Sequence, residues 1–341
     1  MKFLQSKIIK FLALIIFSLF ATLLLQQWVG GETIYSDNYK ADRLQLHEAI
    51  LHNKPPEGLS WSSMGAGSTN TRVFSVYLAY TMNMLTHIPV LDVYKAMDTV
   101  TLFITFILLF LYLKKWFNDS YCLIGVFYFF YACVLTYFLY YFHPWDRISL
   151  LSWLIMLFLL RENKILLFAL VLAVSVTIKY DVIFLPALYW LYNFSWDNWK
   201  KTTPVTLGLF AISFGVFGIL TTATSSATEN LSPYLQLMRM VKSNYWDFMK
   251  EFPGYPPLLV FAFPVLLSIT ALPIEDKFMR ACTFFGMMLF IPLFLQSHFH
   301  EVRAEMPVLI LLLPSALMTL HAMLEVSPST LGEPGKTDKY E

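Results

Sequence analysis

Long apolar stretches alternate along the chain with short breaks that carry charged residues. About 20 apolar residues in helical conformation cross the roughly 30 Å hydrocarbon layer of a bilayer. Ten stretches, several of them short, predict membrane-spanning helices at 8–28, 93–113, 120–142, 146–160, 165–178, 182–194, 203–222, 257–272, 281–296 and 306–324. The pattern therefore predicts an all-α polytopic membrane protein with about ten transmembrane helices.

Positive charge in the breaks assigns a side to each span, because cytoplasmic loops of membrane proteins are enriched in Lys and Arg. Lys2 and Lys7 precede the first span and Lys10 lies at its start, which predicts a cytoplasmic N-terminus. Basic pairs then fall in every second loop, at Lys114/Lys115, Arg161/Lys164, Lys200/Lys201 and Lys277/Arg280. A span at 72–90 would invert this alternation, so we expect that segment to lie in the outer interface as an amphipathic helix.

The spans and loops predict a single transmembrane domain over residues 1–324. It has two long external loops, at 30–92 with an acidic stretch and at 223–256. Residues 325–341 are rich in Pro, Gly and charge and read as a disordered cytoplasmic tail. We expect a multi-pass protein of the cell (inner) membrane with both termini cytoplasmic.

Composition narrows the class of protein. The chain is 57% hydrophobic with a mean hydropathy of +0.58, which excludes a soluble domain. Its net charge of +1 gives no basic surface for nucleic acid. Cys122, Cys133 and Cys282 lie in apolar runs, so we expect buried thiols and not disulfides or zinc ligands.

Ionisable residues of both signs gather in the external connections. Charges at membrane depth are costly and usually face a protein interior or a cavity. The candidates are Asp37 and Asp42 in the first loop, then His143, Asp146, Arg147, Lys179, Asp181, His298, His300, Glu301 and Arg303. Arg and Lys neutralise phosphate on a lipid carrier, and a positioned carboxylate removes the proton of an attacking hydroxyl.

Three stretches carry a resemblance to a known family. They are "SDNY" (36–39), "VTIKYDVIFLPAL" (176–188) and "EVRAEMPVLILLLP" (301–314). Their order, with an anchor helix and interfacial helices in the first external loop, resembles that of the GT-C membrane glycosyltransferases, which include protein O-mannosyltransferases and aminoarabinose transferases. The resemblance implies that Asp37, or else Asp42, is the catalytic base. It also implies that Lys179 and Arg303 bind the donor phosphate, and Arg147 is a further candidate for that role.

The function implied is transfer of a sugar from a polyprenyl-phosphate-linked donor to a glycan, lipid or protein acceptor on the external face, by an inverting single displacement. A surface-polysaccharide polymerase or ligase is an alternative that also handles lipid-linked glycans. A transporter or flippase is another, and it would show inverted repeats and charges at mid-bilayer. A non-catalytic membrane scaffold is a fourth.

The same residues also have structural interpretations. Asp37 can cap a helix that begins near Tyr39, Lys179 and Asp181 can pair where the chain turns, and Glu301 and Glu305 can neutralise Arg303. Trp145 is typical of an anchor at headgroup depth. No cofactor is indicated with certainty: His298 and His300, with Glu301 or a first-loop aspartate, can hold a divalent metal, but an H-x-H pair alone is a weak signal.

Overall fold

The computed structural model describes residues 2–32, 37–54, 71–138, 145–224, 242, 245–246, 249–250, 256–271, 274–296 and 302–325. Every regular element within these ranges is helical. They are α1 (Lys2–Leu23), the π-helical turn η1 (Leu24–Val29), α2 (Gly30–Glu32), α3 (Asp37–Leu51), α4 (Val73–Thr86), α5 (Val90–Leu113), α6 (Asp119–Phe138), α7 (Asp146–Arg161), α8 (Ile165–Ile178), the 3-10 helix η3 (Tyr180–Phe184), α9 (Leu185–Asn193), α10 (Trp199–Ala223), α12 (Pro256–Thr270), α13 (Lys277–Gln296) and α14 (Val302–Glu325). The all-α fold class is confirmed for the described residues.

Within the described ranges, five helices are long and apolar enough to cross a membrane: Ile9–Val29, Val90–Leu113, Asp119–Thr136, Trp199–Ala223 and Glu305–Leu324. Two further apolar helices, Ile165–Ile178 and Leu258–Thr270, are shorter. Within each of the ten predicted ranges, the residues that the structure describes are helical, apart from Phe194 and Ala271, which directly follow α9 and α12. A membrane-embedded, multi-pass protein follows from these helices, whereas the count of ten spans stays a prediction.

The predicted span at 182–194 is not one continuous α-helix. Its first part belongs to η3, and α9 has nine residues, which at 1.5 Å per residue is about 14 Å. Pro186 lies in the first turn of α9, where its fixed φ angle and missing N–H are tolerated, so the helix restarts there. The neighbouring helices are short as well: α7 has 16 residues and α8 has 14, about 24 and 21 Å.

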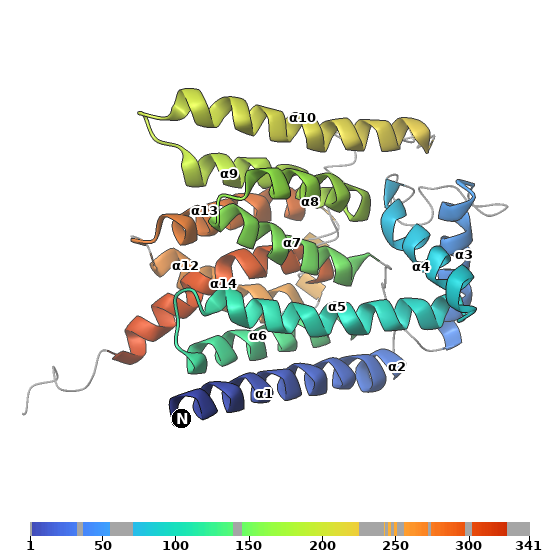
Figure 1. The fold of residues 1–341 in the computed structure, drawn as a ribbon, viewed down its shortest axis with the longest axis horizontal. Coiled ribbons are helices and arrows are strands. Elements are labelled where there is room, and N and C mark those ends of the chain that lie inside the picture. Colours follow the sequence, from blue (N-terminus) through green and yellow to red (C-terminus); the bar gives the residue numbers. More distant parts are fainter. Residues whose placement is uncertain are drawn as a thin grey trace, which may run out of the picture.

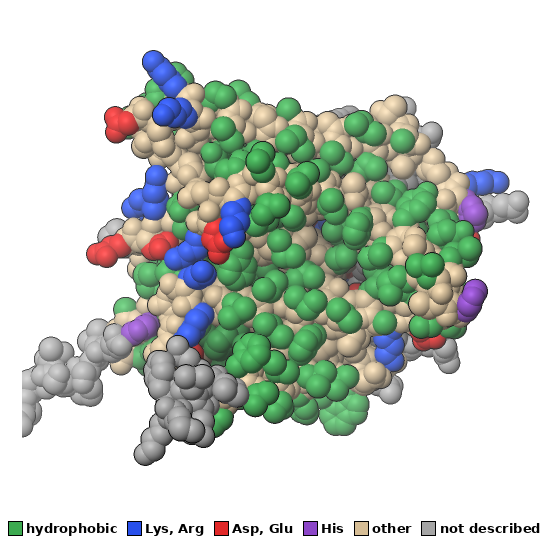
Figure 2. Space-filling view, viewed as in Figure 1, with side chains coloured by type: hydrophobic (Ala, Val, Ile, Leu, Met, Phe, Trp, Pro, Cys, Tyr) green, Lys and Arg blue, Asp and Glu red, His purple; other side chains and the backbone are tan. Residues whose placement is uncertain are grey.

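The long helices run side by side as a bundle, and α3 and α4 lie across one end of it (Figure 1). α14 is at the centre and packs against α12, α13, α6 and α7. Six consecutive residues of α14, 308–313, are all apolar and all buried. A helix that is apolar on every side is stable only where protein or lipid surrounds it, and α14 is surrounded by protein. Figure 2 shows hydrophobic side chains across the middle of one face, with charged side chains gathered toward its two ends.

The breaks with the basic pairs meet at one end of the bundle. Lys10 Nζ lies 2.8 Å from Asp119 Oδ2, which connects the start of α1 to the turn between α5 and α6. Arg161 at the end of α7 lies 3.7 Å from Asp276 before α13. These pairs are at least partly exposed, so each contributes little to stability. Lys115 Nζ also lies 3.9 Å from Glu162 Oε1, so these contacts bring the breaks after α5, α7 and α12 to one end, as the charge pattern predicts for them.

The segment 72–90 forms α4, whose 14 residues are too few to cross a bilayer. Its inner face is made of small or branched residues, Ser75, Val76 and Ala79, which are buried. Large apolar side chains of α4, among them Met84 and Leu85, are exposed. A helix that lies across the bundle end with apolar side chains outward matches the expected interfacial helix, whose membrane position stays a prediction.

The two bundle ends can be placed on opposite sides of the membrane by labelling. His52 follows α3, Trp196 lies between α9 and α10, and both side chains are exposed. We expect a membrane-impermeant maleimide added outside intact cells to label His52→Cys, and Trp196→Cys to react only after permeabilisation. Cys122, Cys133 and Cys282 are buried, so the wild-type chain is a low-background control. Labelling of both variants from one side would contradict this arrangement.

Acid should destabilise the packing of α3 and α4 across the end of the bundle. His47 of α3 is buried with its Nδ1 2.7 Å from the Tyr94 hydroxyl, and burial lowers its pKa below the usual value, although Glu48 opposes the shift. The unfolded state then binds the proton more readily, so stability falls as the pH drops below about 6.5. Hydrogen exchange of α3 should be faster at pH 5.5 than at pH 7.5, after correction for intrinsic rates. His47→Gln should remove this difference, whereas replacement of the exposed His52 by Gln should retain it.

Candidate functional site

Charged side chains from three distant parts of the chain meet inside the bundle at the end covered by α3 and α4. Asp146 begins α7, Lys179 and Asp181 flank the junction of α8 with η3, and Arg303 is the second residue of α14. Their side chains are between 4% and 10% exposed. With Arg72, described below, we call these residues the ionic cluster.

Asp146 is the common counter-ion of two cations. Arg303 Nη1 donates a hydrogen bond of 3.0 Å to Asp146 Oδ2, across a separation of 157 residues. Lys179 Nζ lies 3.8 Å from Asp146 Oδ1 and 3.5 Å from Asp181 Oδ2. Arg303, Asp146, Lys179 and Asp181 thus form an alternating row of charges, in which Lys179 is held more loosely than Arg303.

Helix ends explain most of these positions. Asp146 and Asp181 occupy first turns, and Lys179 follows the last residue of α8 in extended conformation, with φ −158° and ψ 127°. Carboxylates at helix N-termini and cations at C-termini are favoured by the helix dipole, by roughly 0.3–1 kcal/mol each. Arg303 is the exception, since it sits in the first turn of α14. Its pairing with Asp146 compensates for that placement.

Arg72, just before α4, is the cation that sequence analysis missed. Its guanidinium carbon lies 4.8 Å from the ring centre of Trp145 and 5.2 Å from that of Tyr180. It therefore contacts the residue before Asp146 and the residue between Lys179 and Asp181. The sequence did contain a signal for Arg72. It is an ionisable residue at the start of the apolar segment 72–90, which we expect in the interface, and ionisable residues in such places are functional candidates.

The ionic cluster has a formal excess of one positive charge: Arg72, Lys179 and Arg303 against Asp146 and Asp181. Burial raises the pKa of Asp181, and the charges of Lys179 and Arg72 oppose that rise. A buried group of charges is costly unless each is compensated. Arg147, next to Asp146, and Glu305, two residues after Arg303, are buried as well, so the count describes the ionic cluster alone and not the net charge of this end of the bundle.

Arg147, the other predicted phosphate ligand at this connection, points elsewhere. Its Nη2 donates a 2.8 Å hydrogen bond to Thr136 Oγ1 of α6, and the side chain is buried. This contact joins α7 to α6. Arg147 therefore has a visible structural role, and its role toward phosphate stays a prediction.

Trp145 is not the headgroup-level anchor that the sequence suggests. Its side chain is fully buried in a cluster with Leu46 and Ile50 of α3, Val76 of α4 and Ile178 at the end of α8. α3 and α4, the helices of the predicted first external loop, cover the indole ring of Trp145. The sequence around Trp145 gives no indication of this contact. This packing also places α3 and α4 directly beside the residues next to Asp146 and Lys179.

The predicted base lies on α3. Asp37 is the first residue of this helix and Asp42 lies in its second turn; their side chains are outside the described part of the structure. Asp37 is nine residues before Leu46, about 14 Å along the helix axis, and Leu46 belongs to the buried contact with Trp145 and Ile178. The helix carrying Asp37 and Asp42 is thus anchored at the ionic cluster.

The remaining predicted site residues, His143, His298, His300 and Glu301, lie outside the described residues. Within the described ranges no group of three His, Cys, Asp or Glu side chains is placed to hold a metal ion. The predicted 325–341 tail also lies outside them from residue 326 onward.

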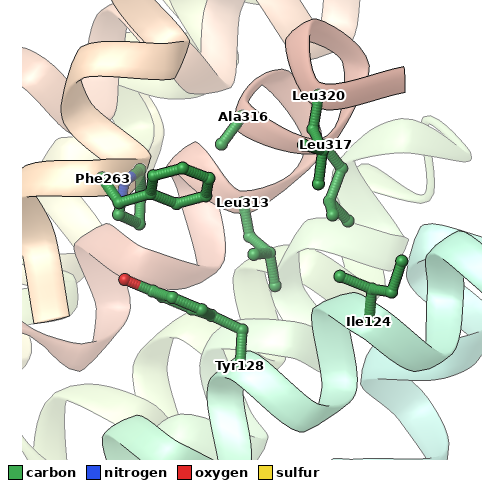
Figure 3. Close-up of a pocket in the computed structure, with 8 residues that line it drawn as sticks. Ile124, Tyr128, Phe263, Leu313, Ala316, Leu317 and Leu320 are labelled. Carbon is green, nitrogen blue, oxygen red and sulfur yellow. The ribbon is translucent and has the colours of Figure 1, made fainter. Parts of the chain in front are cut away.

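An apolar pocket between α6, α12 and α14 offers a different environment (Figure 3). Tyr128 points toward it beside Phe263 and Leu313, and its hydroxyl donates a 2.7 Å hydrogen bond to the Val260 carbonyl. The lining supplies no carboxylate, histidine or cation. Among the described residues, the ionic cluster is therefore the better candidate for catalytic or anion-binding chemistry.

Comparison of the chain with known protein families, with curated proteins and with solved structures gives no match.

Removal of the shared counter-ion should destabilise the protein strongly. Asp146→Asn leaves Arg303 and Lys179 buried without their common carboxylate, a kind of change that costs about 3–5 kcal/mol. We expect a lower unfolding temperature in detergent, measured by intrinsic fluorescence. Glu162→Gln is the matched control, because Glu162 pairs with Lys164 at the exposed opposite end and should leave that temperature unchanged. Equal effects of the two changes would contradict a structural role for Asp146.

Proposed function

We propose that the protein is a GT-C-type membrane glycosyltransferase of the bacterial or archaeal cytoplasmic membrane. It transfers a sugar from a polyprenyl-phosphate-linked donor to an acceptor on the external face. The observation that carries the proposal is the ionic cluster: Arg303 and Lys179 are buried around Asp146 beneath the helices of the first external loop. Cations at that depth match a donor whose phosphate sits at the membrane interface.

Lys179 and Arg303 bind the donor phosphate in this proposal. A guanidinium has five N–H donors in a planar fork, and Arg303 directs one of them at Asp146 Oδ2. Lys179 Nζ is at 3.8 and 3.5 Å from its two carboxylates, beyond the usual length of a charge-assisted hydrogen bond. It can therefore turn toward a phosphate at small cost.

The chemical step is a single displacement with inversion. Asp37, or Asp42 in its place, takes the proton of the acceptor hydroxyl while the oxygen attacks the anomeric carbon of the sugar. The bond from that carbon to the phosphate oxygen breaks, and its electron pair leaves with the polyprenyl phosphate. The leaving phosphate gains one negative charge, so fixed cations beside it stabilise the transition state more than the ground state.

The test is a comparison of membrane glycolipids by mass spectrometry in a deletion strain complemented with wild type, Asp37→Asn, Asp42→Asn or Lys179→Met at equal expression. We expect the deletion and Lys179→Met to accumulate a polyprenyl-phosphate sugar, and one glycan to lose a single residue. One of the two aspartate variants should do the same. Lys200→Met is the control for charge removal, because Lys200 is exposed at the opposite end and should restore the wild-type profile.

Other profiles would point to other functions. Loss of long glycans without loss of a single residue would favour the polymerase or ligase. Accumulation of a complete lipid-linked glycan on the cytoplasmic side would favour the flippase. An unchanged glycolipid profile in the deletion strain would overturn the proposal.

A further inference from the structure

Asp181 and Arg72 bury hydrogen-bonding atoms that find no partner among the described residues. Both are 8% exposed. Lys179 Nζ, at 3.5 Å, and the Trp153 indole both face the Asp181 carboxylate, but neither forms a hydrogen bond of good geometry with it, and Arg72 Nε likewise has none among these residues. Buried polar atoms in native proteins are nearly always hydrogen-bonded, to protein, water or ligand. Two acceptors and a donor beside the proposed phosphate site therefore call for an occupant.

Packing fixes both groups in place. Arg72 is held against the faces of Trp145 and Tyr180, a contact that restrains the plane of its guanidinium. Asp181 follows Tyr180 directly and is restrained by Lys179 at 3.5 Å. The unbonded atoms are thus parts of side chains with little freedom to seek other partners. A rigid arrangement of this kind is typical of a preorganised binding site.

The hydrogen-bonding chemistry of Asp181 and Arg72 indicates which chemical group they would bind. A phosphate has only acceptor oxygens, so Asp181 would repel it. An ammonium group would add positive charge to a place where Lys179 and Arg72 already face Asp181. A hydroxyl group both donates and accepts, so adjacent hydroxyls can donate to Asp181 and accept from Arg72. Neutral sugars present such hydroxyls in pairs.

Lys179 connects this pair to the proposed phosphate site. Its Nζ lies between Asp146 and Asp181, at 3.8 and 3.5 Å. In a sugar phosphate the phosphate and the ring hydroxyls are only a few bonds apart. A ligand whose phosphate contacts Lys179 and Arg303 would therefore bring its sugar ring to the side of Asp181.

We infer that Asp181 and Arg72 form a sugar subsite that hydrogen-bonds hydroxyl groups of a neutral donor sugar and so determines donor specificity. The inference rests on the proposed function, and it assigns to Asp181 a binding role in addition to its ion pair with Lys179.

The test measures binding of purified full-length protein to bare undecaprenyl phosphate and to undecaprenyl phosphates carrying glucose, mannose, galactose or 4-amino-4-deoxyarabinose, by native mass spectrometry. We expect wild type to bind at least one neutral-sugar lipid about tenfold or more tightly than the bare lipid, as for hydrogen bonds to charged groups. In Asp181→Ala that ratio should fall toward one, with affinity for the bare lipid kept or increased. Lys179→Met should weaken binding of every lipid.

Three further variants separate recognition from folding. Asp181→Asn keeps an acceptor oxygen and should retain part of the sugar preference, and Arg72→Lys should lower it. Asp92→Ala is the control, because Asp92 is an exposed aspartate at the same end of the bundle and should leave the ratio unchanged. If Asp181→Ala does not fold, the Asn and Lys variants carry the test.

Each contrary result has a distinct meaning. A ratio unchanged in the Asp181 variants, or an equal loss of bare and sugar-bearing lipid, would overturn the subsite, since the second result is that of a structural residue. A dependence on Asp181 confined to the aminoarabinose lipid would show recognition of charge and would also overturn it. Failure of wild type to bind even bare undecaprenyl phosphate would instead defeat the proposed function.

Discussion

The burial of Asp146 between two cations is the constraint on which this end of the protein depends. A lone charge inside a helical bundle costs several kcal/mol, so the buried Arg303, Lys179 and Asp146 each gain from the opposite charge beside them. Because they come from α14, the end of α8 and the start of α7, their pairing sets how these helices meet. The core leucines of α14 give the bundle its cohesion, but apolar contacts are tolerant of rotation and sliding. The ion pairs specify one arrangement.

The two ends of the bundle use charge differently. At the end with the basic pairs, Lys10, Lys164 and their partners are at least partly exposed, and water or headgroups can replace any one of them. At the other end the charges are enclosed by α3, α4 and aromatic rings. The exposed ion pairs are explained by the enrichment of basic residues in the loops on one side of the membrane. The enclosed ion pairs form only where the surrounding helices pack in one specific way. This difference is why the enclosed end is the candidate site.

The sequence alone predicted the helical segments, the basic residues in every second break, and the individual charged residues at the predicted outer connections. Asp146, Lys179, Asp181 and Arg303 stood out because ionisable residues are rare beside apolar spans. Their mutual pairing was not predictable, since Asp146 and Arg303 are 157 residues apart and local spacing carries no information on such contacts. Arg72 was missed, and Trp145 was misjudged, for a related reason. Their environment is made by α3 and α4, whose docking depends on tertiary packing. The break within 182–194 escaped notice because hydropathy does not distinguish one long helix from a 3-10 turn and a short one.

The short helices beside the ionic cluster have a consequence for the surrounding lipid. Among them, α8 is about 21 Å long and exposes large apolar side chains such as Leu166 and Leu170, against a hydrocarbon layer of about 30 Å. A bilayer meets such a mismatch by thinning locally. The leaflet at the end of α8 would then dip beside this helix, and its headgroups would descend toward the level of Lys179, which follows α8. In the proposed function, a carrier lipid diffusing in that leaflet would reach the buried cations sideways, with its long chain still in the membrane.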